Sequence, residues 1–471
     1  MQTIKIHGLG ASGEGVGKLD GLTVFVEGAL PDEEILADIV TVKKNYAVAR
    51  LVEVVKNSSE RVKPFCPLYK DCGGCQLQHL SYPAQLKYKR QQVVDAVERI
   101  GKLGGVEIFD TLGMDNPLRY RNKMQFPVGK AIRNAQCVMR NDKTLKLKAP
   151  SSKLKVQSSN VIGCYARGSH KIIDTPSCMI QNVGNDKILT AVRNVAQKFN
   201  LQPYDEDTHK GFLRHVMGRV GSNGELMIVL VTATKNFPNE KNFVRALIKE
   251  LPEVTSIQQN VQTFHNNVIL GRDTKILYGK PTIHDKIGEL IFNISARSFF
   301  QVNTAQAEIL YKTARDFAEL RGNETVIDAY CGTGTISLFL AKKARKVIGV
   351  EVVSSAINDA IKNARENNIR NAEFIVGDAV KALPRLFSDG IFAEVVIVDP
   401  PRAGCDKKVL ETFAAMQPEK IIYVSCNPAT LARDLKILDE RGYRTKKIQP
   451  VDMFPFTSHV ESVAQILKIK S

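Results

Sequence analysis

A thiol stands at the junction of two expected elements in YVSCNPATLARDL, residues 423–435. An apolar run ending at Val424 predicts a buried strand, and ATLARDLKIL predicts a helix, so Cys426 lies in the turn between them. A thiolate in such a turn can act as a nucleophile, which usually works with a nearby base. The run HVESV near the C-terminus offers Glu461 as that base. The alternative is that Cys426 is a small buried side chain and Glu461 an exposed one.

The elements that would position this thiol alternate between strands and helices from about residue 280 onward. The expected strands are TVIDAY, KVIGVE, EFIVGD, EVVIVD and KIIYVS, followed by a strand pair near YRTKKIQPVDMF and HVESVAQILKI. Alternating strands and helices indicate a parallel sheet covered on both faces. Ligands of such sheets bind at the carboxyl ends of the strands, where each of the motifs below falls.

The first three strand ends indicate a nucleoside cofactor. VIDAYCGTGTISLFLA reads as a strand, a Gly-x-Gly turn and a helix, and glycines let the backbone approach a ligand closely. The second strand ends in Glu351, which can accept hydrogen bonds from a ribose diol, and the third is followed by Asp378, beside an expected adenine pocket. Ser337 follows where the dinucleotide fingerprint would have a third glycine, which disfavours NAD. The combined pattern resembles the class I S-adenosylmethionine methyltransferases.

The fourth strand ends in VIVDPPRAG, which places Asp399 and two prolines before Arg402. Methyltransferases that act on exocyclic base amines resemble this pattern but have an aromatic residue in place of Arg402, so amine methylation is disfavoured. A pyrimidine C5 is a poor nucleophile until a thiolate adds to C6 and pushes electron density onto C5. After methylation a base must remove the C5 hydrogen before the thiolate can leave. Cys426 and Glu461 would supply these two groups.

The composition indicates a polyanionic partner. The 471 residues carry a formal net charge of +17, with a pI near 9.4, which favours nucleic acid. Residues 117–171 contain many lysines and arginines against a single acidic residue, Asp142, which indicates contact with a phosphate backbone. No apolar run approaches the ~18 residues that a membrane-spanning helix needs. The N-terminal MQTIKIHGLGASGEG lacks a secretory signal, so a cytoplasmic protein is expected.

A second group of thiols lies in CPLYKDCGGCQLQH, where Cys66, Cys72 and Cys75 have the spacing Cys-x5-Cys-x2-Cys. In a cytosolic chain such thiols bind a metal more often than they form disulfides. Zinc normally uses two Cys-x2-Cys pairs, and this segment has one. Three local ligands with a distant fourth favour an iron–sulfur cluster.

The motifs DPPRAG, SCNPATLARDL and HVESV, in this order and spacing, resemble those of the uracil-C5 RNA methyltransferases, which form 5-methyluridine. The resemblance implies that Cys426 is the nucleophile and Glu461 the base. The cofactor-binding residues that it implies, together with those expected from the strand ends, are Gln301 in SFFQVN, Tyr330, Thr335, Glu351, Asp378 and Asp399. Cytosine-C5 RNA methyltransferases carry an additional cysteine where this chain has Arg402, so Cys331 and Cys405 are interpreted as structural.

The ribosomal branch of that family has the same cysteine spacing and binds a [4Fe-4S] cluster. The resemblance implies Cys66, Cys72, Cys75 and Cys178 as its ligands, with Cys164 as the alternative fourth ligand. It also implies three domains: a small OB-like β-barrel of the TRAM type over 1–56, which the short strands there also favour; a central α+β RNA-binding domain with the iron–sulfur cluster over 57–279; and a C-terminal α/β, Rossmann-like class I methyltransferase domain over 280–471.

The expected function is S-adenosylmethionine-dependent methylation of uridine C5 in 23S ribosomal RNA, because a TRAM-like barrel together with the cluster resembles the ribosomal enzymes. RNA is the expected partner, with no DNA and no membrane, and the expected state is a monomer. Two alternatives stay open. One is the same chemistry on the T-loop of transfer RNA, and the other is a non-catalytic RNA-binding iron–sulfur protein in which Cys426 is expendable.

Overall fold

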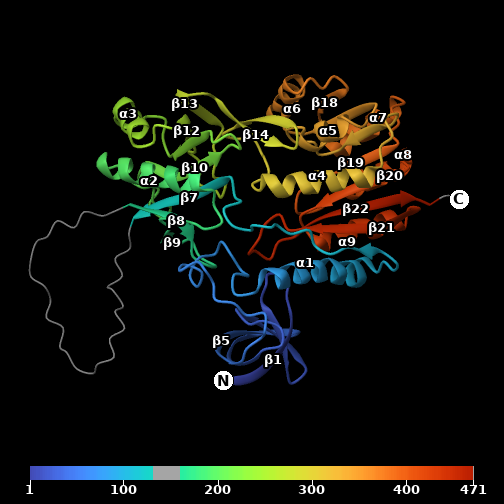
Figure 1. The fold of residues 1–471 in the computed structure, drawn as a ribbon, viewed down its shortest axis with the longest axis horizontal. Coiled ribbons are helices and arrows are strands. Elements are labelled where there is room, and N and C mark those ends of the chain that lie inside the picture. Colours follow the sequence, from blue (N-terminus) through green and yellow to red (C-terminus); the bar gives the residue numbers. More distant parts are fainter. Residues whose placement is uncertain (131–159, 470–471) are drawn as a thin grey trace, which may run out of the picture. The chain divides into compact units, whose positions relative to one another are not determined.

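The structure is a computed structural model that describes residues 1–130 and 160–469 (Figure 1). Most of the basic run expected to contact phosphate, including Arg133 to Lys155, lies outside the described residues. The chain divides into two compact units. The first comprises Met1–Asn122, Gly221–Asn223 and Thr282–Ser471, and the second comprises Lys123–Val220 and Gly224–Pro281. In the described ranges no helix combines the length and apolar character needed to cross a membrane.

The N-terminal part of the first unit is a closed five-stranded barrel, as the short strands predicted. Its strands are β1 (Gln2–Leu9), β2 (Gly15–Leu19), β3 (Leu22–Glu27), β4 (Glu34–Val42) and β5 (Tyr46–Lys56). Buried and exposed side chains alternate along β1 and β3, which fills the barrel with small aliphatic residues such as Ile4 and Val24. Gly17 is required in β2, because a Cβ there would lie 2.5 Å from the Ile4 side chain.

A single long helix follows the cysteine-containing loop. Helix α1 (Tyr82–Ala96) begins where the hydroxyl of Ser81 accepts a hydrogen bond from the amide of Ala84, and it continues into one π-helical turn, η1 (Val97–Gly101). Most of the run AQLKYKRQQVVDAVERI, which contains no glycine or proline before Gly101, lies in this helix. Helix α1 packs against α9 (Pro428–Asp439).

The large sheet of the first unit has eight strands in the order β18-β17-β16-β19-β20-β22-β21-β6. Their bounds are β6 (Glu107–Ile108), β16 (Thr325–Asp328), β17 (Lys346–Glu351), β18 (Ala372–Val376), β19 (Val395–Val398), β20 (Lys420–Ser425), β21 (Tyr443–Val451) and β22 (Glu461–Lys468). Strands β16 to β20 are parallel, whereas β22 pairs antiparallel with β20. The order reverses between β16 and β19, which is where open α/β sheets bind ligands.

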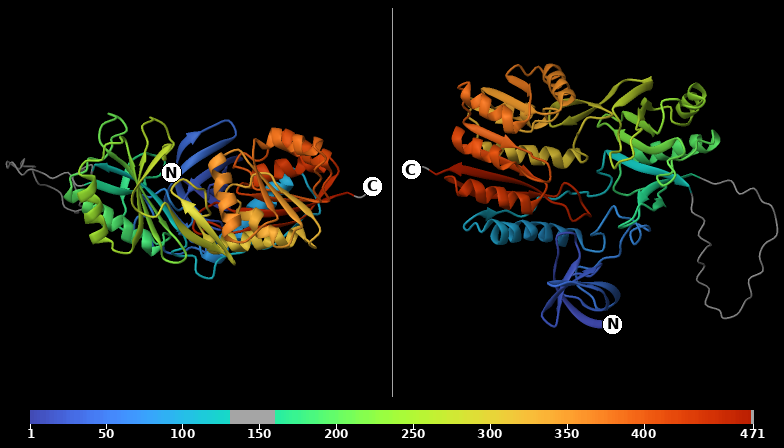
Figure 2. Two further views of the ribbon diagram at one scale, coloured as in Figure 1. Left: turned by 90° about the horizontal axis from the view of Figure 1, so that it is seen from above. Right: turned by 180° about the vertical axis from the view of Figure 1, so that it is seen from behind.

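Helices cover both faces of this sheet (Figure 2). Helices α4 (Thr304–Ala318), α5 (Thr335–Ala341) and α6 (Ser354–Glu366) contact it on one face, and α7 (Ala379–Ser388), α8 (Lys407–Met416) and α9 pack with α1 over the other. A hairpin of β14 (Thr282–Ile287) and β15 (Leu290–Ser295) precedes α4. This architecture confirms the Rossmann-like fold expected for the C-terminal part.

The second unit is an α+β domain built on a seven-stranded sheet of order β13-β12-β11-β10-β7-β8-β9. Its elements are β7 (Lys123–Lys130), β8 (Asn160–Tyr165), β9 (Ile172–Asp174), α2 (Val183–Lys198), β10 (Leu213–Val220), β11 (Leu226–Thr232), α3 (Glu240–Glu250), β12 (Val254–Val261) and β13 (Asp273–Gly279). Helices α2 and α3 pack on the sheet around Ile188, Val192 and Phe243.

Candidate active site

The turn that carries Cys426 is fixed by its neighbours on both sides. Strand β20 ends at Ser425, whose hydroxyl oxygen accepts a hydrogen bond from the Asn427 amide at 3.2 Å. Asn427 then caps α9, since its side-chain oxygen accepts a hydrogen bond from the Ala429 amide at 3.0 Å, and Pro428 starts the helix. The thiol therefore sits in a defined turn and is only partly buried, as the sequence predicted.

Strand register places Glu461 opposite Cys426. Strands β20 and β22 are antiparallel, with Val424 opposite Val463 and Ser425 opposite Ser462. Cys426 and Glu461 are the next residues in this register, and opposed residues of an antiparallel pair have Cα atoms about 5 Å apart. The two side chains are close enough for Glu461 to raise the pKa of Cys426. Glu461 is only 5% exposed. The structure thus brings together the two side chains that the sequence proposed as nucleophile and base.

Burial and mutual repulsion raise the pKa values of the acidic groups of this site and so favour their protonated forms. Burial, reinforced by Asp399, raises the pKa of Glu461 to about 8. Burial, reinforced by Asp328, raises the pKa of Asp399 to about 7. Burial, reinforced by Glu461 and Asp399, raises the pKa of Cys426 to about 11. Such a concentration of carboxyl groups favours a cationic ligand, which would release protons from them.

Arg402 is the cation of this site in the described residues. Its guanidinium opposes the raised pKa of both Cys426 and Glu461. The backbone oxygen of Arg402 accepts hydrogen bonds from Asn427 Nδ2 and Thr430 Oγ1, each at 3.3 Å. A guanidinium nitrogen lies 3.5 Å from Nε2 of His459. Sequence reasoning used Arg402 only to exclude other chemistry and gave His459 no role, although both stand inside the motifs it examined.

The residues expected to hold the cofactor follow successive strand ends. Across the sheet the order is Asp378 after β18, Glu351 at the end of β17, Tyr330 after β16 and Asp399 after β19. The Glu351 carboxylate accepts hydrogen bonds from the amides of Gly332, at 3.2 Å, and Val353, at 2.9 Å. The exposed Asp378 also caps α7, because its side chain accepts a hydrogen bond from the Val380 amide at 3.0 Å.

Tyr311, on α4, connects two further expected residues. Its hydroxyl lies 3.2 Å from Thr335 Oγ1 and within hydrogen-bonding reach of the Gln301 side chain. Burial raises its pKa, and the nearby carboxylates of Asp399 and Glu461 add to that shift. Tyr311 is 2% exposed. It carries no sequence motif, so sequence reasoning missed it.

The glycine turn suits a ligand that lies directly on the backbone. Gly332 and Gly334 have φ of +54° and +79°, which favour glycine. A Cβ added at Gly332 would meet no atom within 4 Å, whereas at Gly334 it would approach Ala360 and Phe374 at 3.0–3.1 Å. One glycine therefore faces open space and the other is packed. This turn and the surrounding carboxyl groups fit a nucleoside that bears a sulfonium cation.

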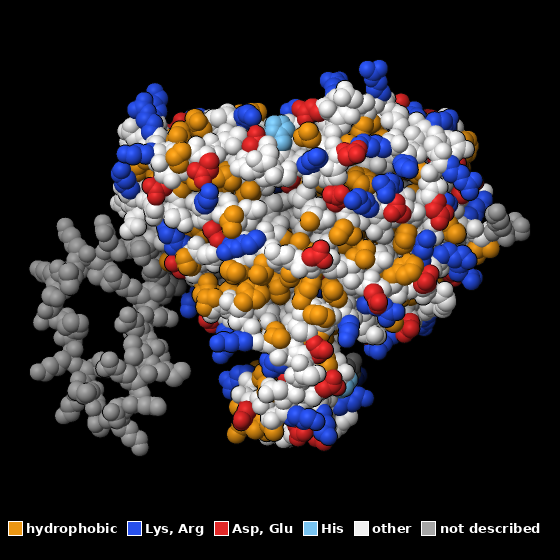
Figure 3. All heavy atoms as spheres, viewed as in Figure 1, with side chains coloured by type: hydrophobic (Ala, Val, Ile, Leu, Met, Phe, Trp, Pro, Cys, Tyr) orange, Lys and Arg blue, Asp and Glu red, His pale blue; other side chains and the backbone are white. Residues whose placement is uncertain are grey.

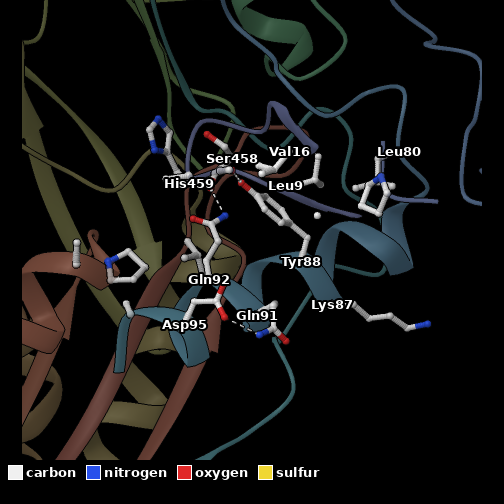
Figure 4. A pocket seen from close by; sticks show the side chains of 18 of the residues that line it. Leu9, Val16, Leu80, Lys87, Tyr88, Gln91, Gln92, Asp95, Ser458 and His459 are labelled. Atoms are coloured by element: carbon white, nitrogen blue, oxygen red, sulfur yellow. Dashed lines mark hydrogen bonds between the residues drawn. The ribbon is translucent and has the colours of Figure 1, made fainter. Parts of the chain in front are cut away.

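A hollow of about 1120 Å³ in the first unit has Cys426 in its lining. Barrel residues such as Leu9 and Val16, one face of α1, and the turn containing Ser458 and His459 also line it (Figure 4). Cys426 therefore lies in the wall of this hollow, beside residues of the barrel and of α1.

The three clustered cysteines share one loop of the first unit, between β5 and α1. The Cys72 sulfur accepts a hydrogen bond from the Gly74 amide at 3.3 Å, and Cys72 contributes to the raised pKa of Cys66, which is due mainly to burial. Cys178 and Cys164 belong to the second unit. Within residues 1–130 and 160–469, no group of three or more Cys, His, Asp or Glu side chains is arranged to hold a metal ion.

Cys331 and Cys405 are buried, which supports their structural interpretation. Burial raises the pKa of Cys405 to about 12. The Cys405 amide donates to the Asp434 carboxylate at 2.8 Å, and the Tyr423 hydroxyl donates to the same carboxylate at 2.6 Å. This buried network fixes the chain between β19 and α8 against β20, beneath the Cys426 turn.

Two family models match the chain. Residues 241–469 match the model described as tRNA (Uracil-5-)-methyltransferase, and residues 1–52 match the TRAM domain. An RNA methyltransferase of Halalkalibacterium halodurans is 48% identical over 469 residues, which cover 99% of this chain and 97% of the relative. The chain belongs to the S-adenosylmethionine-dependent RNA uracil-5 methyltransferases.

Other members of the family agree with this assignment along the whole chain. An RNA methyltransferase of Clostridium tetani is 50% identical over 459 residues, or 97% of this chain and 94% of the relative. The crystal structure of Pyrococcus abyssi tRNA (uracil-54, C5)-methyltransferase in complex with S-adenosyl-L-homocysteine has a TM-score of 0.74, with 27% identity over 99% of this chain and 100% of that one. The recognition of the family from its motifs is thereby confirmed.

The raised pKa of Glu461 predicts how stability depends on pH. The pKa rises from 4.5 to about 8 on folding, so between these values the folded chain retains a proton that the unfolded chain has released. Stability therefore falls as pH rises through this window, by up to about 1.4 kcal/mol per pH unit from this group. Glu461→Gln removes the effect, so the free energy of unfolding of the variant relative to wild type should increase from about pH 5 to about pH 8.

Chemical denaturation at several pH values measures this difference. Glu373→Gln, which changes an exposed carboxylate paired with Lys346, is the matched control and should show no comparable trend. Parallel pH profiles for wild type and Glu461→Gln would contradict the buried, protonated carboxyl group.

Proposed function

We propose that this enzyme methylates C5 of a uridine in 23S ribosomal RNA through a covalent bond between Cys426 and C6. The observation that carries the proposal is the placement of a partly buried thiol opposite a buried carboxyl group, at the strand ends that also carry Asp399 and the glycine turn. Methylation at C5 needs both groups, because the nucleophile must add to C6 and a separate base must remove the proton from C5.

The two side chains act in sequence. The Cys426 thiolate adds to C6, and the electrons of the C5–C6 double bond move toward C5 and the O4 carbonyl. Bound S-adenosylmethionine would supply the electrophilic methyl group to C5. The Glu461 carboxylate then takes the C5 proton, the C5–H electron pair restores the double bond, and the C6–S pair leaves with sulfur. The Arg402 guanidinium favours the ionised forms of both side chains.

The cofactor would be held by residues from several strand ends. We assign this role to Gln301, Tyr330, Thr335, Glu351, Asp378 and Asp399. The Glu351 carboxylate is oriented by two backbone amides, as a group that binds a ribose diol must be. Tyr311 orients Gln301 and Thr335 from α4.

Ribosomal RNA is favoured as the substrate because the chain combines a TRAM barrel with the three-cysteine loop. The target base must leave its stack to reach Cys426, at a cost on the order of a few kcal/mol that other RNA contacts must offset. Basic and acidic side chains are interspersed on the face shown in Figure 3. The net charge of +17 and the hollow beside the barrel still favour binding of a polyanion by a single copy of the chain.

We also propose a [4Fe-4S] cluster on Cys66, Cys72, Cys75 and Cys178, with Cys164 as the rival fourth ligand. The support is the spacing of three thiols in one loop and the electrostatic coupling of Cys66 with Cys72. The expected role of the cluster is to stabilise the RNA-binding domain, since no step of the proposed reaction involves oxidation or reduction of the protein.

Transfer RNA is the second candidate substrate, because the Pyrococcus abyssi structure similar to this chain is that of a tRNA (uracil-54, C5)-methyltransferase. The chemistry at Cys426 and Glu461 would be unchanged.

Substrate RNA that contains 5-fluorouridine should form a denaturation-resistant complex with the wild-type enzyme and S-adenosylmethionine, since fluorine cannot leave C5 as a proton. Cys426→Ala should form none, because it lacks the attacking sulfur. Denaturing gels measure the complex, and Cys405→Ala provides a control at a buried thiol. Fragments of 23S RNA that contain 5-fluorouridine should give the complex, whereas transfer-RNA transcripts that contain it should give little. If transfer RNA gave the complex and 23S fragments did not, the substrate would be transfer RNA. A complex with Cys426→Ala would show that Cys426 is not the nucleophile.

Anaerobically purified protein should contain about four irons per chain and show the visible absorption of a [4Fe-4S] cluster. Replacing Cys66 or Cys75 by Ser should abolish both signals, whereas Cys331→Ser should retain them. Cys178→Ser and Cys164→Ser distinguish the two candidates for the fourth ligand. Iron that is absent from the wild type, or that survives loss of Cys66, would exclude the cluster.

A further inference from the structure

A buried ion pair lies outside the machinery described above. The Nζ of Lys89, on α1, lies 2.5 Å from Oδ1 of Asp452, and both side chains are 0% exposed. Neither group can touch RNA or cofactor directly, because neither reaches the surface. A buried ion pair is also weak evidence for added stability, since desolvation of the two charges opposes their attraction. The hydrogen bonds of the ion pair are directional, so they can instead hold the backbone around Asp452 in one conformation.

Asp452 begins an irregular segment, residues 452–459, which is followed by Val460 and then by Glu461, the first residue of β22. One face of α1 binds this segment at successive positions. The Tyr82 hydroxyl donates to Asp452 Oδ2 at 3.0 Å, and Lys89 Nζ donates a second hydrogen bond, to the Phe454 oxygen, at 3.1 Å. These side chains, with Gln85 and Gln92, are spaced to share one helical face.

The same face of α1 holds the far half of the 452–459 segment. Gln85 accepts a hydrogen bond from the Phe456 amide at 3.0 Å, and Gln92 donates to the Ser458 oxygen at 3.0 Å (Figure 4). Phe456 has a φ of +67°, a conformation that a bulky residue adopts only where its surroundings impose it. The segment is therefore held against α1 in a conformation it would not choose alone.

The cofactor side of the site binds the segment as well. Asn303 Nδ2 donates to the Met453 oxygen at 3.1 Å, and Gln306 Nε2 donates to the Asp452 oxygen at 2.9 Å. Asn303 lies two residues beyond Gln301, which we assign to the cofactor. The 452–459 segment thus lies between α1 and the start of α4. Lys89 anchors its beginning through two hydrogen bonds, whereas Arg402 approaches only His459 at its end.

We propose that Lys89 and Asp452 are positioning residues for the catalytic base. Their ion pair fixes the 452–459 segment so that Glu461 meets the C5 hydrogen of the methylated ring. This inference rests on the proposed function. It assigns the pair to the last half of the reaction, in which the C5 proton passes to Glu461 and sulfur leaves C6. Addition of Cys426 and transfer of the methyl group depend on β20 and the cofactor residues instead.

The variants Lys89→Met and Asp452→Asn test the inference with ordinary uridine in the RNA. Lys89→Met should lower steady-state turnover about tenfold or more, while methyl transfer in the first turnover changes by less than about twofold. The enzyme should accumulate as a covalent complex with methylated RNA, because proton removal has become slow. Asp452→Asn keeps the shape of the side chain and should show the same signature.

Two reference variants separate this role from other effects. Glu461→Gln lacks the base and should accumulate the same complex to the greatest extent. Glu33→Gln breaks another pair with a fully buried carboxylate, that of Glu33, between β3 and β4, with Arg61, and should lower thermal stability without accumulating the complex. Circular dichroism identifies any variant that fails to fold. If Lys89→Met fails to fold, Asp452→Asn and the double variant Lys89→Met/Asp452→Asn, which removes both charges, test the positioning role instead.

Two results in the folded variants would overturn the positioning role. One is that steady-state turnover and first-turnover methyl transfer fall together and no covalent complex accumulates. The other is that turnover does not change. The proposed function fails in a different way: wild type would transfer no methyl group, or Glu461→Gln would trap no complex. A trapped complex in Glu461→Gln that is absent from Lys89→Met and Asp452→Asn therefore refutes the inference alone.

Discussion

The antiparallel register between β20 and β22 is the constraint on which the active site depends. Parallel strands alone place the glycine turn, Asp399 and Cys426 along one edge of the sheet. Each parallel strand ends at that edge, so only the residues at its carboxyl end lie there. Strand β22 runs the opposite way, so its first residue, Glu461, lies there and faces the turn after β20. A shift of one residue would send the carboxyl group to the other face of the sheet and separate nucleophile from base.

The second organising feature is electrostatic. Three acidic groups and a thiol share a site in which burial is the main cause of every raised pKa. Without a bound sulfonium, and even with Arg402 present, the raised pKa values favour protonated Glu461 and an un-ionised Cys426 thiol near neutrality. A sulfonium and the Arg402 guanidinium both favour the charged forms. Binding of the methyl donor would thereby help to activate the nucleophile and the base, which couples occupancy of the site to its reactivity.

Sequence patterns predicted the positions of those site residues that depend only on neighbouring residues in the chain. Cys426 and Asp399 each follow an apolar strand, and the rule that ligands gather at strand ends placed both correctly. The HVESV run offered Glu461 as a base and the family resemblance implied the same role, but no local pattern could place it against Cys426, because the register of two distant strands is not a local property. Lys89 was missed for the same reason. A lysine in a polar stretch is expected to be exposed to solvent, and the burial of Lys89 depends on Asp452, 363 residues later. The short β6 and the first two barrel strands were also not anticipated individually.

A disulfide test examines the central register most directly. Opposed positions of an antiparallel pair are close enough for a disulfide, so mild oxidation of Glu461→Cys should link the introduced thiol to Cys426, as peptide mass spectrometry would show. Ser462→Cys, whose side chain points to the other face of the sheet, should give no such link. A linked peptide in the first variant and not in the second is the predicted result. No link in Glu461→Cys, or a link only in Ser462→Cys, would contradict the arrangement of nucleophile and base.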